Sequence, residues 1–143
     1  MAGRRRLRRS FALPPDFLIR MHELSIASSI VESVLEFAAK NEIKKVLEVK
    51  LVIGELMAVE WEQLRFCYTA ITGETAMENS SLEIEQVEAM VQCPYCSFRG
   101  RPKYWEDAWS FGSIATLECP ECGKAAEAVQ GKECAIKTIK YVG

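Results

Sequence analysis

Apolar residues recur at the spacing of one helix face over residues 24–40. They fall at i, i+3, i+4, i+7, i+8 and i+11, which predicts an amphipathic helix: Ala27, Ile30, Val31, Val34, Leu35 and Ala38. Asn41 is the predicted stop. A second helix is predicted over residues 60–71, with an apolar side formed by Trp61, Leu64, Cys67, Tyr68 and Ile71.

Three segments read as strands. Residues 47–53 alternate between apolar and mainly charged positions and end at Gly54, the pattern of a half-buried strand. Residues 82–91 are strand-like, although their apolar positions change parity between Ile84 and Val87, which indicates a β-bulge. Residues 134–142 resume strand composition at the end of the chain.

The terminal strand is apolar enough to need a sheet, and the simplest arrangement returns it to the first domain. We therefore predict an α+β fold in which a small three-stranded sheet and two helices form one domain, residues 21–91 with 131–143. Residues 92–130, which show little periodicity, would form an inserted zinc-ribbon-like domain.

The first twenty residues differ from the rest of the chain. They hold six arginines and one aspartate in a protein whose net charge is −2, so the body is acidic and would repel a phosphate backbone. Pro14-Pro15 interrupts the apolar core that an export signal needs, whereas a transit peptide stays open. We expect residues 1–20 to be a leader that is disordered or not translated, with the functional chain beginning at Met21.

Four of the six cysteines form two Cys-x-x-Cys pairs, Cys93/Cys96 and Cys119/Cys122. Two intervening residues let both thiolates of a pair bind one ion, and the tight turn directs backbone N–H groups at sulfur. The spacing predicts a metal site in a reducing compartment, which we expect to be the cytoplasm; a disulfide framework is the alternative. Cys67 and Cys134 stand alone in apolar surroundings and are interpreted as buried thiols.

Four thiolates fill a tetrahedral shell, which leaves no position for a reactive water and predicts a structural zinc site. An iron site would use the same ligands, but no other redox feature accompanies the cysteines. So small a module buries too little apolar surface to fold without its metal. With one histidine and no phosphate-binding glycine loop, we predict no catalytic residues and no enzyme activity.

That histidine, His22, stands immediately before the first predicted helix. The residues around it suit a helix start, so a surface histidine is the simpler interpretation. If Met21 is the N-terminus, however, its amine, the next amide nitrogens and the imidazole form adjacent chelate rings. A planar, nitrogen-rich shell is what Ni(II) and Cu(II) prefer. Residues ahead of Met21 would convert the amine to an amide and crowd this site.

Several motifs together resemble one family. The Met-His-Glu-Leu segment at 21–24, the amphipathic helix, Val-Ile-Gly-Glu-Leu at 52–56, both cysteine pairs and the closing strand at 135–140 are similar to the hydrogenase nickel-insertion accessory proteins, the HypA/HybF family. The resemblance runs from Met21 to the C-terminus. It implies a nickel metallochaperone that carries Ni(II) on Met21, His22 and Glu23 and holds zinc on Cys93, Cys96, Cys119 and Cys122.

The resemblance also implies partners: a HypB-type nucleotide-hydrolysing protein and the [NiFe]-hydrogenase large subunit. The chain departs from those relatives that add a histidine from the zinc module, because it has no second histidine. The fourth nickel ligand would then be the Met21 amine, a carboxylate or water. Glu60 is a further candidate, although a glutamate at a helix start also explains itself.

Other interpretations remain at this stage. A zinc-ribbon adaptor could bind nucleic acid through the Arg-rich leader, although the acidic body argues against a nucleic-acid partner. No apolar stretch reaches the roughly 18 residues of a membrane helix, so no membrane partner is expected. A homodimer stays open. The aromatic residues of the insert are expected to cover the metal site, with an exposed patch for a partner as the alternative: Tyr104, Trp105, Trp109 and Phe111.

Overall fold

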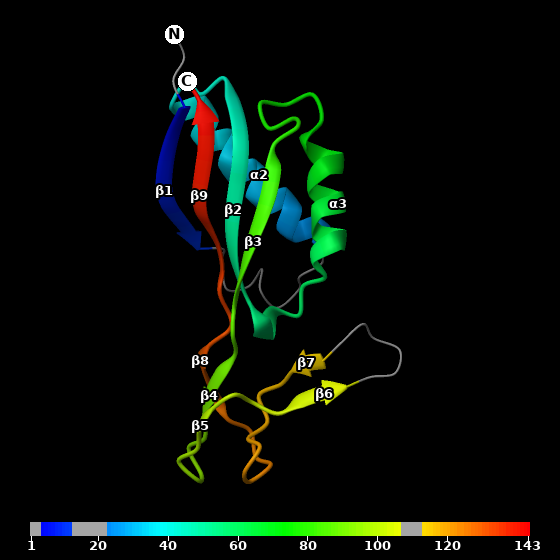
Figure 1. The fold of residues 1–143 in the computed structure, drawn as a ribbon, viewed down its shortest axis with the longest axis vertical. Coiled ribbons are helices and arrows are strands. Elements are labelled where there is room, and N and C mark those ends of the chain that lie inside the picture. The colour runs from blue at the N-terminus through cyan, green and yellow to red at the C-terminus, as the bar shows by residue number, and fades with distance from the viewer. Residues whose placement is uncertain (1–3, 13–22, 107–112) are drawn as a thin grey trace. The chain divides into compact units, whose positions relative to one another are not determined.

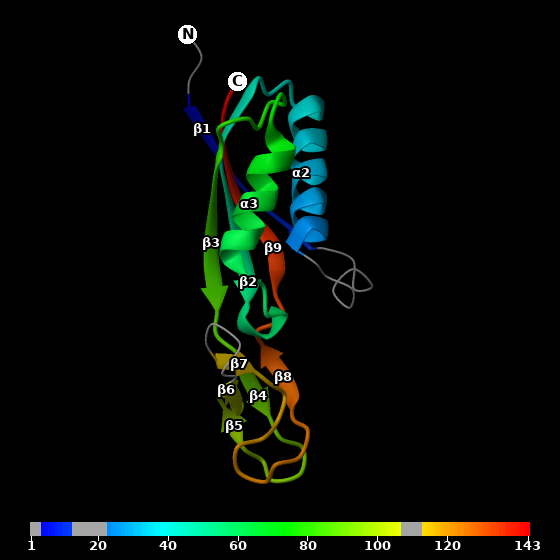
Figure 2. The ribbon, with the colours of Figure 1, turned by 90° about the vertical axis from the view of Figure 1, so that its right-hand side faces the viewer.

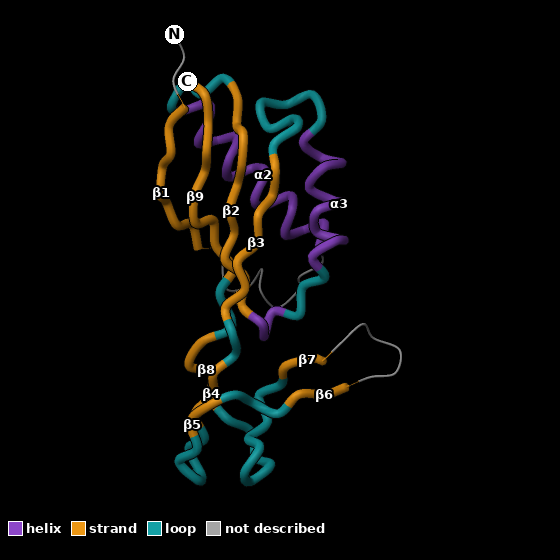
Figure 3. Tube along the Cα trace, in the orientation of Figure 1, coloured by secondary structure: helices purple, strands orange, loops and turns teal. Residues whose placement is uncertain are grey.

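The computed structural model describes residues 4–12, 23–106 and 113–143. Along the chain the elements are β1 (Arg4–Ala12), α2 (Glu23–Lys40), β2 (Lys45–Gly54), the 3-10 helix η1 (Glu55–Met57), α3 (Trp61–Thr72), β3 (Ser81–Val87), β4 (Met90–Gln92), β5 (Arg99–Gly100), β6 (Tyr104–Glu106), β7 (Ser113–Ala115), β8 (Glu127–Gln130) and β9 (Cys134–Val142). Figure 1 labels them, and Figure 3 colours them by type.

The chain divides into two compact units. The first comprises Met1–Val52, Val59–Glu85 and Cys134–Gly143, and the second comprises Ile53–Ala58 and Gln86–Glu133. The second unit begins earlier than the predicted insertion at 92–130 and also takes in the segment that contains η1. The strand that was predicted to run continuously over 82–91 is two strands, β3 and β4, and the change of parity marks the break between them.

In the first unit, α2 and α3 cover one face of the sheet (Figures 1 and 2). Five residues of the predicted apolar stripe of α2 are buried and Leu35 is half-buried: the five are Ala27, Ile30, Val31, Val34 and Ala38, joined by Ile26 and Phe37. α3 contributes Leu64, Cys67 and Tyr68, and β2 and β9 contribute the buried residues Val49, Leu51, Ile136 and Ile139. Because these side chains leave water together, their burial supplies the main favourable term for folding this unit.

Local hydrogen bonds mark the end of α2 and the start of α3. The backbone and side-chain amides of Asn41 donate to the Phe37 carbonyl at 3.1 and 2.8 Å, and Glu42 turns the chain away with a φ of 53°. Glu60 is the N-cap of α3, where its carboxylate accepts from the Glu62 N–H at 3.2 Å. At the far end of α3, the Tyr68 hydroxyl is 2.6 Å from Ser80 Oγ.

The sheet of the first unit has four strands in the order β1-β9-β2-β3, one more than predicted. The additional strand is β1, which lies in the segment that we expected to be disordered or untranslated. It pairs with β9 in antiparallel register from Arg4 opposite Val142 to Ala12 opposite Ala135, with an irregularity between Arg8 and Phe11. The three-stranded prediction is therefore wrong, because strand-forming residues in the leader complete the edge of β9. No strand was expected in that segment.

The second unit consists of short strands and loops besides η1 (Figure 3). Its strands form a three-stranded sheet in the order β5-β4-β8 and a β6-β7 ribbon. The segment 53–58 joins it where Gly54 crosses Gly131. There the Gly54 N–H donates to the Glu133 carbonyl at 2.7 Å, and the Leu56 N–H donates to the Gly131 carbonyl at 2.8 Å. A Cβ on Gly54 would lie 2.0 Å from the Gly131 carbonyl oxygen, so only glycine permits this approach.

Within the described ranges, neither helix has the length and apolar character that crossing a bilayer would demand.

Candidate metal centre

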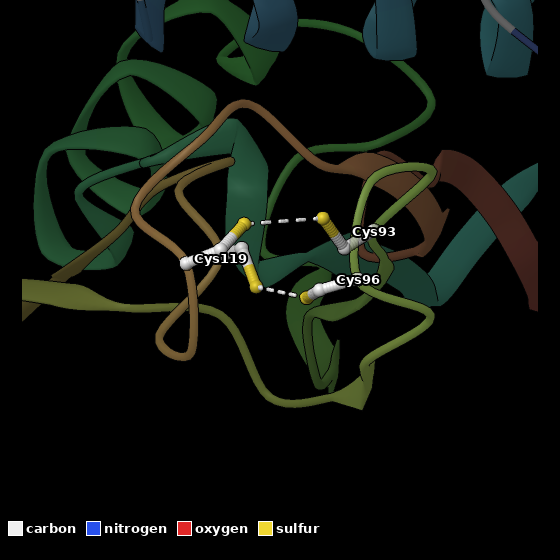
Figure 4. Close-up of side chains that lie close together, drawn as sticks. Cys93, Cys96 and Cys119 are labelled. Atoms are coloured by element: carbon white, nitrogen blue, oxygen red, sulfur yellow. Dashed lines mark hydrogen bonds between the residues drawn. The ribbon is translucent and has the colours of Figure 1, made fainter.

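Four cysteine sulfurs converge in the second unit. One Sγ atom from each of Cys93, Cys96, Cys119 and Cys122 lies within 4.8 Å of all the others. The closest approaches cross between the two pairs, since Cys93 Sγ is 3.5 Å from Cys122 Sγ and Cys96 Sγ is 3.5 Å from Cys119 Sγ. Figure 4 shows Cys93 and Cys96 facing Cys119 across a small common space. The structure thus brings together all four cysteines that the spacing predicted as metal ligands.

The two loops that carry them repeat the same backbone hydrogen bonds. The Cys93 N–H donates to the Phe98 carbonyl at 2.8 Å, and the Cys119 N–H donates to the Lys124 carbonyl at 2.9 Å. In each loop, the residue after the second cysteine donates its N–H back to the carbonyl of the first, from Ser97 at 3.1 Å and from Gly123 at 2.9 Å. This repeat holds both thiols of a pair on the same side of a tight turn.

Each loop also requires one left-handed residue at the same place. Gly123 has a φ of 76°, and Ser97 has a φ of 64°. Glycine adopts this conformation freely, whereas a residue with a Cβ pays about 1–2 kcal/mol for it. Gly123 indicates the left-handed conformation in the second loop, whereas Ser97 at the same place in the first loop gives no such indication.

Burial differs between the two members of each pair. Cys93 and Cys119 are each 1% exposed and pack with Val91, Ala126 and the partly buried Phe98. Cys96 and Cys122 are exposed. An ion held here would be embedded in a small apolar cluster on one side and approachable on the other.

The sulfurs influence one another's protonation. Burial raises the pKa of Cys93, but the backbone N–H groups of Tyr95 and Cys96 and the thiols of Cys122 and Cys96 outweigh it, and the pKa falls to about 7. The Phe98 N–H favours the Cys96 thiolate, yet burial and the neighbouring sulfurs prevail and raise the pKa of Cys96 to about 12. Four sulfurs this close cannot all ionise unless a cation neutralises them.

The donor set fits a zinc ion. With Zn–S bonds of about 2.3 Å, a regular tetrahedron separates its sulfurs by about 3.8 Å. The two 3.5 Å separations lie close to that value, and the 4.8 Å limit leaves room for small adjustments. Backbone N–H groups directed at the sulfurs are the usual outer support of such a site. Four thiolates would fill the tetrahedral shell of such an ion.

A polar cluster that sequence reasoning missed lies in the same unit. The Glu55 carboxylate accepts hydrogen bonds from the Ala89 N–H at 2.8 Å, from Tyr104 Oη at 2.8 Å and from Arg101 at 3.2 Å. Arg101 also donates to Tyr104 and forms an ion pair with Glu88 at 3.1 Å. These contacts fasten the 53–58 segment to the rest of the unit. Their partners are distant in sequence, so no local signal reveals them.

The predicted nickel residues are described only in part. Met21 and His22 lie outside the described residues. Glu23 is the first residue of α2, and its carboxylate accepts from the Glu60 N–H at 3.1 Å, which brings together two of the four candidates. The Glu60 carboxylate itself caps α3. The start of α2 and the start of α3 are therefore neighbours in the first unit.

The remaining candidates divide into buried thiols and an exposed aromatic. Cys67 and Cys134 are buried and free, as predicted, and burial raises the pKa of Cys134 to about 11. Trp105 is 61% exposed, so the expectation that it covers the metal site is wrong. It stands opposite Ile114, itself 40% exposed, on the two-stranded β6-β7 ribbon. Trp109 and Phe111 lie outside the described residues.

A family model described as "Hydrogenase/urease nickel incorporation, metallochaperone, hypA" matches residues 21–141. The chain belongs to the HypA family. Its relatives include the Hydrogenase maturation factor HypA of Methanopyrus kandleri, 34% identical over 84% of this chain and 92% of the relative. That of Chlorobium limicola is 37% identical over 83% of this chain and 95% of the relative.

Solved structures share the fold. The Ni metallochaperone HypA from Helicobacter pylori superposes with a TM-score of 0.54 at 24% identity, covering 83% of this chain and 96% of that one. A second HypA solution structure gives a TM-score of 0.57 at 23% identity, covering 85% and 97%. The HypA match begins at residue 21, so β1 lies outside the part of the chain that defines the family. The predicted family and the predicted α+β class are confirmed.

Proposed function

We propose that this protein binds Ni(II) and helps to insert it during maturation of [NiFe]-hydrogenase, while zinc on the four cysteines maintains the fold of the second unit. Membership of a nickel-incorporation family is the observation that carries the proposal. That family's description names both hydrogenase and urease. We favour hydrogenase because the curated relatives are named hydrogenase maturation factors.

In a chain that begins at Met21, nickel would be held at the start of α2 by the Met21 amine, the backbone nitrogens that follow it, the His22 imidazole and Glu23. The contact between Glu23 and the Glu60 N–H supports this location, because it fastens the first turn of α2 to the first turn of α3. Glu23 is thereby held in place, and the candidate ligands Met21 and His22 directly precede it in the sequence. Glu60 supplies a second carboxylate nearby, although its capping hydrogen bond to Glu62 competes with a role as ligand.

Delivery requires a site that can be dismantled. Ligands at the free end of a chain can be exchanged one at a time by a partner, whereas ligands on two hydrogen-bonded loops cannot separate without unfolding the loops. The proposed nickel ligands would lie at a free chain end, whereas the cysteines of the metal cluster lie on two hydrogen-bonded loops. We therefore assign nickel as cargo and zinc as a resident ion with a structural role.

The partners that follow are a HypB-type nucleotide-hydrolysing protein and the hydrogenase large subunit. Nucleotide hydrolysis would belong to that partner, so we assign no enzyme activity to this chain. We also propose that it works in the cytoplasm, since its cysteine cluster needs thiolates and all six cysteines are free. The alternative of a nucleic-acid adaptor would use the Arg-rich leader, and residues 4–12 of that leader are paired with β9.

Nickel titration tests the proposal. A zinc-loaded protein beginning at Met21 should bind one Ni(II) by isothermal calorimetry, and His22→Ala should lose that site while retaining one zinc per chain. Glu32→Ala, which removes an exposed acid elsewhere on α2, is the matched control and should bind nickel like the parent. Equal nickel affinity in the parent and His22→Ala would refute the assignment. Salt-dependent retention of RNA or DNA by the full chain would support the adaptor instead.

A further inference from the structure

Strand β9 lies beside the edge strand β1 in the first unit's sheet, and only β9 belongs to the part of the chain that the HypA family model matches. β9 and its other neighbour, β2, fall within the part of the chain that matches the HypA family, whereas β1 lies before it. Removing β1 would therefore leave the β9 backbone at an open edge. Unpaired edges of this kind are templates for another strand.

The pairing in the structure shows that this edge accepts an antiparallel strand. Residues Arg4–Ala12 run along β9 from Val142 to Ala135 with one irregularity. The β9 lysines do not repel such a strand strongly, because each is already ion-paired. Lys137 Nζ lies 2.6 Å from Glu85, and Lys140 Nζ lies 2.7 Å from Glu48.

β1 in turn has the properties of a strand that ends a sheet. Five of its nine residues are arginines, it contains no acidic residue, and its pairing is irregular near its middle. Like charges and irregular pairing are the means by which natural sheets discourage a further strand. β9 carries two lysines, both ion-paired, and most of its residues are apolar or β-branched, so its own length is less protected.

We propose that residues 4–12 occupy a strand-acceptor edge on β9, and that in their absence this edge binds β9 of a second copy of the chain. The sequence of β9 suits antiparallel pairing with itself about Thr138. That register places Thr138 opposite its symmetry mate and each lysine opposite an isoleucine, so that no two lysines face each other. Threonine pairs of this kind are favourable, and directly opposed like charges are not. The resulting interface would be isologous, as a two-fold dimer requires.

The test compares four zinc-loaded proteins: the full chain, a chain beginning at Met21, and the full chain with Leu7→Pro or Leu7→Ala. Leu7 stands opposite Ile139 in the register. Proline there removes a donor and interrupts β1, whereas alanine leaves the backbone intact and serves as the matched control. Mass is measured by analytical ultracentrifugation over a range of concentrations, and amide exchange of residues 135–142 by mass spectrometry.

We expect the full chain and Leu7→Ala to be monomers with protected β9 amides at every concentration. The Met21 chain and Leu7→Pro should approach twice that mass as concentration rises, and their β9 protection should rise with it. A peptide of residues 4–12 should return the Met21 chain to a monomer, and a scrambled peptide of equal composition should not. A Met21 chain that stays monomeric, or that dimerises with β9 protection independent of concentration, would overturn the proposal.

Discussion

Gly54→Ala is the substitution for which the structure makes the sharpest prediction. Gly54 has a φ of −75° and a ψ of 148°, a conformation open to any residue, so alanine meets no backbone strain. Its Cβ, however, would lie 2.0 Å from the Gly131 carbonyl oxygen and 2.7 Å from the Lys132 nitrogen. Both atoms belong to the backbone, which cannot turn aside as a flexible side chain would.

The size of the effect follows from the contacts at this crossing. Restoring an ordinary carbon–oxygen separation requires the two segments to part by more than about 1 Å. They are joined there by hydrogen bonds from Gly54 to Glu133 and from Leu56 to Gly131, at 2.7 and 2.8 Å. Losing both would remove about 1 kcal/mol each, and overpacking adds about 1–3 kcal/mol. We expect the free energy of unfolding to fall by about 3–5 kcal/mol, a large share of the total for a domain.

Gly73→Ala is the control, because nothing lies within 4 Å of a Cβ at that position and its φ is −57°. It should be neutral or stabilising by up to about 1 kcal/mol, through a less flexible unfolded chain. Urea unfolding of the zinc-loaded proteins, with amide exchange to assign the loss to the second unit, measures both. If Gly54→Ala were as stable as Gly73→Ala, the close approach of the two backbone segments would be wrong.

Three further outcomes are expected. Gly123→Ala should destabilise the zinc-loaded second unit by about 1 kcal/mol, and Ser97→Gly should stabilise it by a similar amount, because both residues occupy the left-handed position of a cysteine loop. Amide-exchange protection of the unit should shift equally and in opposite directions for the two proteins. Shifts of the same sign would contradict this expectation. Burial raises the pKa of Tyr68 to about 12, so the folded protein keeps this proton at pH values where the unfolded chain has lost it. The free energy of unfolding should therefore fall by about 1.4 kcal/mol per pH unit between about pH 10 and 12. A Tyr68→Phe protein whose unfolding curves show the same fall would refute this. Removing zinc with a chelator should abolish amide protection in the second unit. The helical circular dichroism signal of α2 and α3 should persist, because the first unit has an apolar core of its own. Simultaneous loss of both signals would show that the units are not independent.

Local patterns in the sequence determined much of this protein. The helical spacing of Ala27 to Ala38 predicted α2, the alternation over 47–53 predicted β2, and the apolar terminal segment predicted β9. The spacing within the two cysteine pairs predicted the metal cluster, because two residues between thiols constrain the loop whatever surrounds it. These features depend on residues a few positions apart, so a linear reading contains them.

Tertiary structure decided the rest. Pairing of β1 with β9 joins the two ends of the chain, and the Glu55 cluster joins partners at Ala89, Arg101 and Tyr104. The contact between Glu23 and Glu60 depends on how two helices pack. A charged leader or an isolated glutamate has the same local pattern whether or not it finds such a partner. Only the folded chain determines which backbone groups and side chains come within bonding distance, and that is why these contacts could not be predicted.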